Sequence, residues 1–274
     1  MAANTMTGGR TAHEAPAIPV RQISDEDLRF SLKQGWEDFR TFRGDILLAG
    51  LVYTLIGIAA VVMTASGPLM PFFLPVVAGV GLLGPVAAVG FYELAERREE
   101  GETNLHWFNF LDVRKRSTVD DMGIVAGLLL AIFFLWLIAA GVLYLLLFGW
   151  TAPPSVGDFL AMVFGTARGW ALIVIGAAIG AVFGWIVLSL SVASLPMLVD
   201  RDVTAAQAVS ASWRAAHANK REMIRWGLTV VGLLILGCIP LFVGLAFVLP
   251  WLGYSTWHLY TRLIDREAIQ APRS

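Results

Sequence analysis

Residues 122–148 read MGIVAGLLLAIFFLWLIAAGVLYLLLF, and none of them carries a charge. In an α-helix these residues rise about 40 Å, and the hydrocarbon core of a bilayer is about 30 Å thick. The stretch therefore predicts a membrane-spanning helix that is long enough to tilt.

The composition of the whole chain agrees with this interpretation. Of the 274 residues, 57% are apolar and 15% are charged, whereas a soluble domain carries about 25% charged residues. The mean hydropathy is +0.69, and these values predict an integral membrane protein. The single cysteine, Cys238, excludes an internal disulfide and a multi-cysteine metal site. Residues 1–22 are polar and lack the apolar segment of a signal peptide, so we expect a flexible tail there and a second short tail at residues 267–274.

Six membrane spans are predicted, within one membrane domain at residues 23–266. The apolar region at residues 226–261 would rise about 54 Å as one helix, which is too long for a single crossing. The segment GCIP at residues 237–240 offers a turn, so we divide the region into a short span and a longer one. Pro85 predicts a kink or local irregularity in the second span. The expected spans are residues 46–64, 70–95, 122–148, 169–195, 224–237 and 240–262.

The placement of cations predicts the orientation. Nineteen of the 20 Lys and Arg residues lie in the termini or in the second and fourth loops, which six spans place on one side, and Arg168 lies on the other side. The positive-inside rule then puts both termini in the cytoplasm. Asp45, Asp121 and Glu222 begin the three outward-running spans, where acidic groups suit helix N-termini.

An amphipathic stretch with one tryptophan and basic residues at its end precedes each outward span. The three stretches are residues 25–43, 104–116 and 204–221. Helices of this kind lie in the membrane interface, with the apolar side in lipid and the cations near anionic headgroups. We therefore expect an all-α polytopic fold of three hairpins, each with a cytoplasmic surface helix, as a weak internal repeat. The alternative, that any loop beside a membrane has this composition, stays open.

The loop after the third span predicts a short helix over residues 156–164. Ser155 and Asp158 form its N-cap, and its apolar side is expected to rest on the outer membrane surface.

The fourth span carries Gly176, Gly180 and Gly184 at four-residue spacing. A ridge of small residues predicts the close approach of another helix. The spacing leaves open whether that helix belongs to this chain or to a second protein.

The predicted spans lack the groups that membrane chemistry needs. Their ionisable side chains lie near the cytoplasmic ends, among them Glu93 and His258. Proton relays, ion paths and coupled transporters place such groups inside the membrane, and haem in the bilayer needs a histidine or methionine at depth. The HExxH, GxSxG and P-loop motifs are also missing from the sequence. We therefore interpret the membrane part as a scaffold and expect no catalytic residues, cofactor or metal.

His258 is the residue that most resembles a ligand. Four aromatic residues near it predict an interfacial aromatic belt, and they are Trp251, Tyr254, Trp257 and Tyr260. We expect His258 to bond a headgroup, a backbone group or a loop carboxylate. A cluster with His106 and His217 is conceivable, although the spacing is not that of a metal motif.

Residues 90–102, GFYELAERREEGE, are dense in charges of both signs, and Glu93 and Arg97 are spaced to pair along one helix. One interpretation is a solvated helix end with local ion pairs. The other is a docking surface for another membrane subunit or for the neighbouring cytoplasmic helices, and both stay open.

Three blocks together resemble the signature of a bacterial family of predicted integral membrane proteins of unknown function. The blocks are residues 32–39 (LKQGWEDF), 90–102 and 255–262 (STWHLYTR), and the resemblance runs from about residue 20 to residue 265. Some members of that family are labelled cytochrome c oxidase subunits, so the resemblance implies a bacterial inner-membrane protein of the respiratory chain. In the family the arginine usually follows the tyrosine of the last block directly, whereas here Thr261 intervenes before Arg262.

A second similarity concerns residues 195–203, LPMLVDRDV, together with Ser212 and Asn219. These residues resemble the inner loop of other six-span families, including the membrane part of some glycerophosphodiester phosphodiesterases, and the similarity is of fold only.

The leading hypothesis is a non-catalytic accessory or assembly subunit of a respiratory complex, with a cytochrome c (haem–copper) oxidase as the complex that the resemblance implies. The first alternative is a small-solute transporter or lipid-handling protein with a hydrophobic cavity, and the second is an enzyme or metal protein that uses the cytoplasmic histidines. The expected partners are membrane lipids and other membrane subunits of the oxidase, and not nucleic acid. The candidate interaction residues are Trp36, Asp38, Tyr92, Glu93, Arg97, Gly176, Gly180, Gly184, Trp257, His258 and Tyr260.

Overall fold

The computed structural model describes residues 17–41, 55, 58, 62, 84–102, 116–150, 153–240 and 243–269. Regular secondary structure in these residues is helical, and one isolated β-bridge joins Val20 to Ile264. The predicted α-helical class is therefore confirmed. The helices are α1 (Asp25–Thr41), α4 (Gly84–Ala87), α5 (Val89–Glu99), α6 (Arg116–Phe148), α7 (Val156–Gly165), α8 (Ala167–Ser191), α9 (Ser194–Asp200), α10 (Ala205–Ala218), α11 (Lys220–Cys238) and α12 (Leu245–Leu263).

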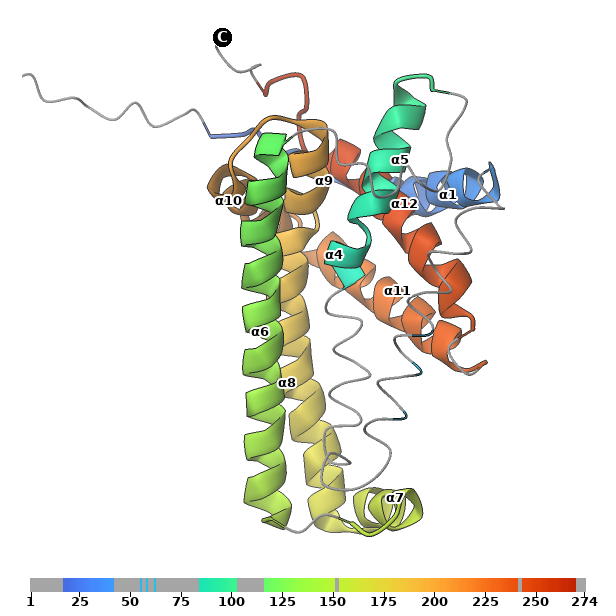
Figure 1. Ribbon diagram of the computed structural model, residues 1–274, viewed down its shortest axis with the longest axis vertical. Coiled ribbons are helices and arrows are strands. Elements are labelled where there is room, and N and C mark those ends of the chain that lie inside the picture. Colours follow the sequence, from blue (N-terminus) through green and yellow to red (C-terminus); the bar gives the residue numbers. More distant parts are fainter. Residues whose placement is uncertain are drawn as a thin grey trace, which may run out of the picture.

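Two long helices, α6 and α8, lie side by side as a hairpin (Figure 1). Among the described helices, Val119–Phe148 and Ala167–Asp200 are the two that are long and apolar enough to cross a membrane, with mean hydropathies of 2.7 and 2.6. They contain the predicted third and fourth spans, but α6 begins six residues earlier than expected. Residues 46–64, the predicted first span, lie outside the described residues apart from positions 55, 58 and 62.

The short helix predicted between these two is present as α7, which crosses the far end of the hairpin (Figure 1). The hydroxyl of Ser155 accepts a hydrogen bond of 3.1 Å from the backbone N–H of Asp158, as the cap predicted. α8 follows almost at once, and a Cβ at Gly169 would lie 2.0 Å from the carbonyl oxygen of Val163. Only glycine fits this turn between α7 and α8, which holds Phe159 and Val163 against Tyr144.

The predicted turn near residue 238 separates α11 from α12. Gly237 and Gly244 meet across it, since a Cβ on Gly244 would lie 2.8 Å from the Cα of Gly237. The two helices form a hairpin that is inclined to α6 and α8 (Figure 1). α11 contains the predicted span 224–237, and α12 begins five residues after the start of the predicted span 240–262; that these helices cross the membrane stays a prediction.

The second predicted span, residues 70–95, is described only from residue 84 onward. The helix there breaks at Ala88, between α4 and α5, which agrees with the irregularity predicted from Pro85. α5 continues to Glu99, beyond the expected end of the span.

The main core lies at the end of the molecule where α1, α5 and α9 pack on α12, and where α10 packs on α8 and α9 (Figure 1). The predicted surface helices at residues 25–43 and 204–221 correspond to α1 and α10, and residues 104–115 lie outside the description. Both helices direct a buried face toward protein: α1 packs on α12, and α10 packs on α8 and α9. The expectation that their apolar sides lie in lipid is thus wrong for these faces, because the hydrophobic periodicity of a helix does not distinguish lipid from a neighbouring helix.

Both helices carry well-formed N-termini. The backbone N–H of Ser24 donates to the carboxylate of Asp27 at 2.9 Å, ahead of the acidic first turn of α1. Thr204 and Gln207 form a capping box at α10. The carboxylate of Asp121, from α6, also accepts the Ala205 N–H at 2.7 Å, which ties α10 to the start of the long hairpin.

A docked N-terminal segment, residues 17–24, closes this end of the molecule. Val20 bridges Ile264, and the Arg21 N–H donates to the carbonyl of Leu263 at 2.8 Å. The buried side chain of Asn219 donates to the carbonyl of Arg21 at 3.0 Å and accepts from the N–H of Ile23 at 2.9 Å. Residues 17–22 were expected to belong to a flexible tail, so the docked segment differs from that expectation.

Candidate functional site

Helices α1, α5 and α12, which are distant in sequence, meet at one junction. α1 lies on one side of α12 and α5 on the other. A Cβ on Gly35 of α1 would lie 2.2 Å from the hydroxyl of Ser255, and a Cβ on Gly253 would lie 2.8 Å from the ring of Phe91 in α5. Glycine therefore allows both close contacts, at Gly35 with the backbone of Ser255 and at Gly253 with the side chain of Phe91.

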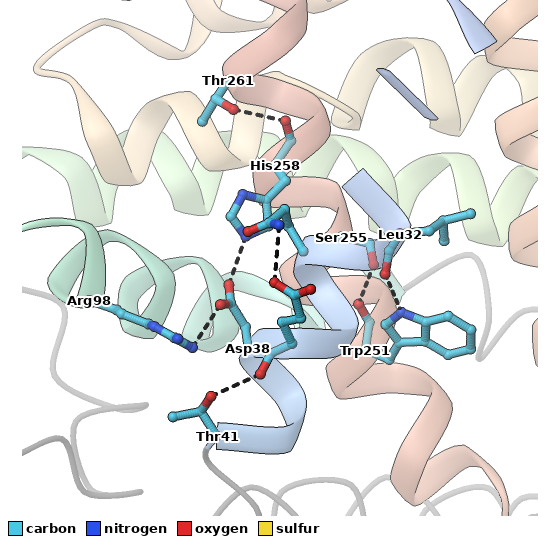
Figure 2. A network of polar contacts seen from close by, with 10 residues as sticks. Leu32, Asp38, Thr41, Arg98, Trp251, Ser255, His258 and Thr261 are labelled. Atoms are coloured by element: carbon cyan, nitrogen blue, oxygen red, sulfur yellow. Dashed lines mark hydrogen bonds and ion pairs between the residues drawn. The ribbon is translucent and has the colours of Figure 1, made fainter. Parts of the chain in front are cut away.

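The polar centre of this junction is Asp38 of α1, whose side chain is 9% exposed (Figure 2). Nε2 of His258 lies 2.7 Å from one carboxylate oxygen, and Nη1 of Arg98 lies 2.7 Å from the other. One carboxylate thus joins α1, α12 and α5. Burial strengthens such a pairing, but it also makes removal of either partner costly.

A loop carboxylate was one of the partners expected for His258. The partner is a carboxylate, but it is that of Asp38 in helix α1. His258 also meets the edge of Phe30, with ring centroids 6.4 Å apart, and Arg262 lies over the Phe30 ring at 4.2 Å. His217 faces other partners: it stacks on Trp213 and hydrogen-bonds the Trp213 carbonyl. Within the described residues, no group of three His, Cys, Asp or Glu side chains is placed to hold a metal ion.

Trp36 lies beside the junction and remains partly exposed. Its ring meets Trp251 of α12 at a centroid distance of 5.2 Å. The indole N–H of Trp251 donates to the carbonyl of Leu32 at 2.9 Å, which is a second tie between α1 and α12 (Figure 2).

The charged segment at residues 90–102 is buried as far as Arg97, whereas residues 99–102 are exposed. Phe91, Tyr92 and Leu94 are almost fully covered, and Glu93 and Arg97 form an ion pair of 2.9 Å between side chains that are 5% and 4% exposed. The interpretation as a solvated helix end therefore holds for residues 99–102 and is wrong for residues 90–97. The segment docks onto α12 and α9 of the same chain, as one form of the alternative predicted.

The aromatic belt predicted at the end of α12 is also wrong. Tyr254, Trp257 and Tyr260 are buried in the protein core, and Trp251 is half-buried. Aromatic spacing at a helix end predicts a membrane interface, but here α1, α5 and α9 cover the helix on several sides.

A second polar cluster, around Asp200, was missed from the sequence. Arg266 donates two hydrogen bonds to its carboxylate, at 2.8 and 2.9 Å, and the hydroxyl of Tyr260 donates a third at 2.6 Å. Arg266 also donates to Glu99 at 2.7 Å. Burial alone would lower the pKa of Arg266, but the hydrogen bonds to Asp200 and Glu99 outweigh it, so the net pKa lies above the ordinary value. Only the alternation of Asp and Arg at residues 200–202 hinted at this cluster.

The candidate residues therefore fall into two groups. The first group lies on the three helices of the junction, α1, α5 and α12. It consists of Trp36, Asp38, Tyr92, Glu93, Arg97, Trp257, His258 and Tyr260. Gly176, Gly180 and Gly184 lie apart from them, along α8. The side chain of Leu143 comes within 3.8 Å of a Cβ built at Gly176, and no described atom comes within 4 Å of one at Gly180 or Gly184. Close packing at the last two glycines stays a prediction.

A carboxylate beside a histidine is also the pair that general acid–base catalysis uses. Here the pair is bonded on its other side to Arg98, and the hydroxyl of Ser255 donates to the carbonyl of Trp251 at 2.7 Å. The carboxylate is thus engaged in joining three helices, and the Ser255 hydroxyl is engaged by a bond within α12.

The three signature blocks, residues 32–39, 90–102 and 255–262, are the segments of α1, α5 and α12 that build this junction. No match was found among the curated proteins or among the solved structures. Residues 73–200 match the model of a family described as "Predicted integral membrane protein (DUF2189)", and this region contains the middle block. Over these residues the resemblance expected from the sequence is confirmed: the chain matches a family of predicted integral membrane proteins.

Proposed function

We propose that this chain is a non-catalytic subunit that supports the assembly or stability of a larger membrane complex. A cytochrome c (haem–copper) oxidase of a bacterial inner membrane is the complex that the family resemblance suggests. The proposal includes six membrane spans with both termini in the cytoplasm.

One observation carries the proposal. The carboxylate of Asp38 in α1 bonds His258 of α12 and Arg98 of α5 across helices, whereas the long hairpin of α6 and α8 exposes apolar side chains along its length. Polar networks of the first kind fix the arrangement of helices. An apolar shaft of the second kind offers surface to lipid and to other membrane helices.

The glycines of α8 are the helix face that we assign to a partner helix. Gly180 and Gly184 leave open space in the described residues, and small residues allow the close backbone approach on which helix association in lipid depends.

Purification of the tagged full-length chain from native membranes in digitonin tests the proposal. We expect oxidase polypeptides, identified by mass spectrometry, and haem absorbance bands in constant ratio to the chain. The double variant Gly180→Leu/Gly184→Leu should lose both, because leucine holds the partner helix away. Gly123→Leu/Gly127→Leu, at two open positions on α6, is the matched control and should retain them.

A colourless preparation without stoichiometric partners would contradict the subunit proposal. A partner-free chain that encloses a solute or lipid in a cavity would instead favour the transporter or lipid-handling alternative.

A further inference from the structure

α11 presents a continuous apolar stripe to its surroundings. The stripe consists of Ile224, Leu228, Val231 and Ile235 of α11 and its C-cap residue Ile239, which are between 52% and 70% exposed. Spacings of three and four residues place them on one side of the helix. The stripe is about 22 Å long, and the opposite side of the helix is buried through Met223 and Trp226.

Two cations stand at the head of this stripe. Lys220 and Arg221 precede Ile224 by four and three residues, so they flank the same face of α11. Both are exposed, and neither takes part in a salt bridge within the part of the chain that the structure describes.

The neighbouring charges leave this pair available. Arg225 lies beside the stripe, and its guanidinium is bonded to the carboxylate of Asp25. That bond holds the pKa of Asp25 below its ordinary value, and Arg221 adds a smaller effect in the same direction. Glu222 lies on the side of the helix away from the stripe, because successive residues turn by about 100°.

We propose that Lys220, Arg221 and the apolar stripe of α11 bind one anionic phospholipid. The phosphate bonds the two cations, and an acyl chain lies along the stripe. Arginine presents a planar donor pair that matches phosphate, and lysine adds a compact charge. The stripe is wholly aliphatic, without the aromatic and arginine anchors that dominate protein–protein contacts. The two cations and the aliphatic stripe together therefore fit a lipid better than a protein.

Native mass spectrometry of the detergent-purified full-length chain tests this site. Phosphatidylglycerol and phosphatidylcholine with the same acyl chains are added in turn, and bound lipids are counted at each concentration. We expect one phosphatidylglycerol to bind on the order of tenfold more tightly than phosphatidylcholine. Lys220→Gln/Arg221→Gln should reduce its binding to the phosphatidylcholine level.

Two controls make the result specific. Lys33→Gln/Arg40→Gln removes the same charge from exposed positions of α1 and should keep the preference. Lys220→Arg/Arg221→Lys preserves the charge and should also keep it, which separates loss of the site from misfolding. Soluble glycerol-1-phosphate in excess should not displace the lipid, because it has no acyl chain.

Several outcomes would overturn the proposal. Equal binding of the two lipids to the unaltered chain would do so, as would equal losses in both neutralising variants. Displacement by glycerol-1-phosphate would show a phosphate site without a lipid. A change in the dimer peak instead of the lipid peaks would assign the stripe to a second copy of the chain.

Discussion

Nε2 of His258 lies 2.7 Å from Oδ2 of Asp38, although 220 residues separate the two in the sequence. The same carboxylate receives Arg98 from a third helix. Asp38→Asn removes the negative charge that Arg98 contacts at 2.7 Å and places an amide donor next to another donor. We expect a loss of about 1–3 kcal/mol in the free energy of unfolding, seen as a lower thermal midpoint in detergent.

Glu37→Gln is the control for this change. Glu37 is the next residue toward the N-terminus, is exposed, and lies 3.9 Å from Lys33, so its replacement should alter stability by less than about 1 kcal/mol. Equal midpoints for the Asp38 and Glu37 variants would show that the buried pairing contributes nothing.

Gly35→Ala tests the crossing of α1 and α12. The new methyl group would lie 2.2 Å from the Ser255 hydroxyl and 2.5 Å from its backbone nitrogen, so backbone has to move. We expect destabilisation of roughly 1–3 kcal/mol or more, measured by thermal unfolding. Gly123→Ala, at an open position on α6, should be neutral or slightly stabilising, because alanine favours helix. An unaffected Gly35 variant would mean that the two helices separate freely.

Asn219→Ala should release the docked N-terminal segment. The side chain bonds the backbone of Arg21 and Ile23 and also the carbonyl of Ala215 at 3.0 Å, and alanine makes none of these bonds. Limited proteolysis followed by mass spectrometry should show faster cleavage at residues 17–24. Ala218→Ser, at the exposed neighbouring position, should leave the cleavage rate unchanged. The same rate in all three proteins would refute the role of Asn219.

Arg266→Gln tests the second cluster. Arg266 is 20% exposed at its side chain and bonds Asp200, which is 5% exposed. Removal of one partner of a buried ion pair costs about 3–5 kcal/mol, and the partial exposure of Arg266 should bring the loss to the lower end. Arg266→Lys should rescue only part of it, since lysine cannot form the paired hydrogen bonds.

The comparison for Arg266 is Arg21→Gln. Arg21 pairs with Asp265 at 2.7 Å, but their side chains are 50% and 33% exposed, so the loss should stay below about 1 kcal/mol. Thermal midpoints in that order support the cluster, and the reverse order would contradict it.

Cysteine labelling tests the placement of the long hairpin across the membrane. In a Cys238→Ala background, Pro154→Cys near α7 and Glu102→Cys at the opposite end are both at exposed positions. A membrane-impermeant maleimide should label the first in intact spheroplasts and the second only after permeabilisation. Labelling of both from one side would refute the proposed crossing by α6 and α8.

The sequence predicted elements whose signals are local. The apolar length of α6, the cap at Ser155 and the turn after Cys238 each depend on neighbouring residues, and the structure has all three. The direction in which α1 and α12 bury their aromatic residues was not predictable in this way. Tyr254 and Trp257 look like interfacial residues until the helices that cover them are known.

The same distinction between local and long-range signals applies to the candidate site. The pairing of Glu93 with Arg97 along one helix was predicted, but the pairing of Asp38 with His258 across 220 residues was not. Asp200 and Arg266 lie near the ends of the predicted apolar segments. Charged residues are expected there simply because water solvates them. A lone sequence holds no signal that pairs them.

The pairing of α1 with α12 has a consequence for biosynthesis. Of the described helices, α1 is translated first, and α12, which packs on the face of Ser31, Gly35 and Phe39, is translated last. During most of translation this face of α1 has to wait uncovered or be shielded by a chaperone. A chain that stops before residue 245 can build the α6–α8 hairpin but lacks α12, so the face of α1 that α12 covers stays exposed. Quality-control factors could recognise truncated copies by this exposed face.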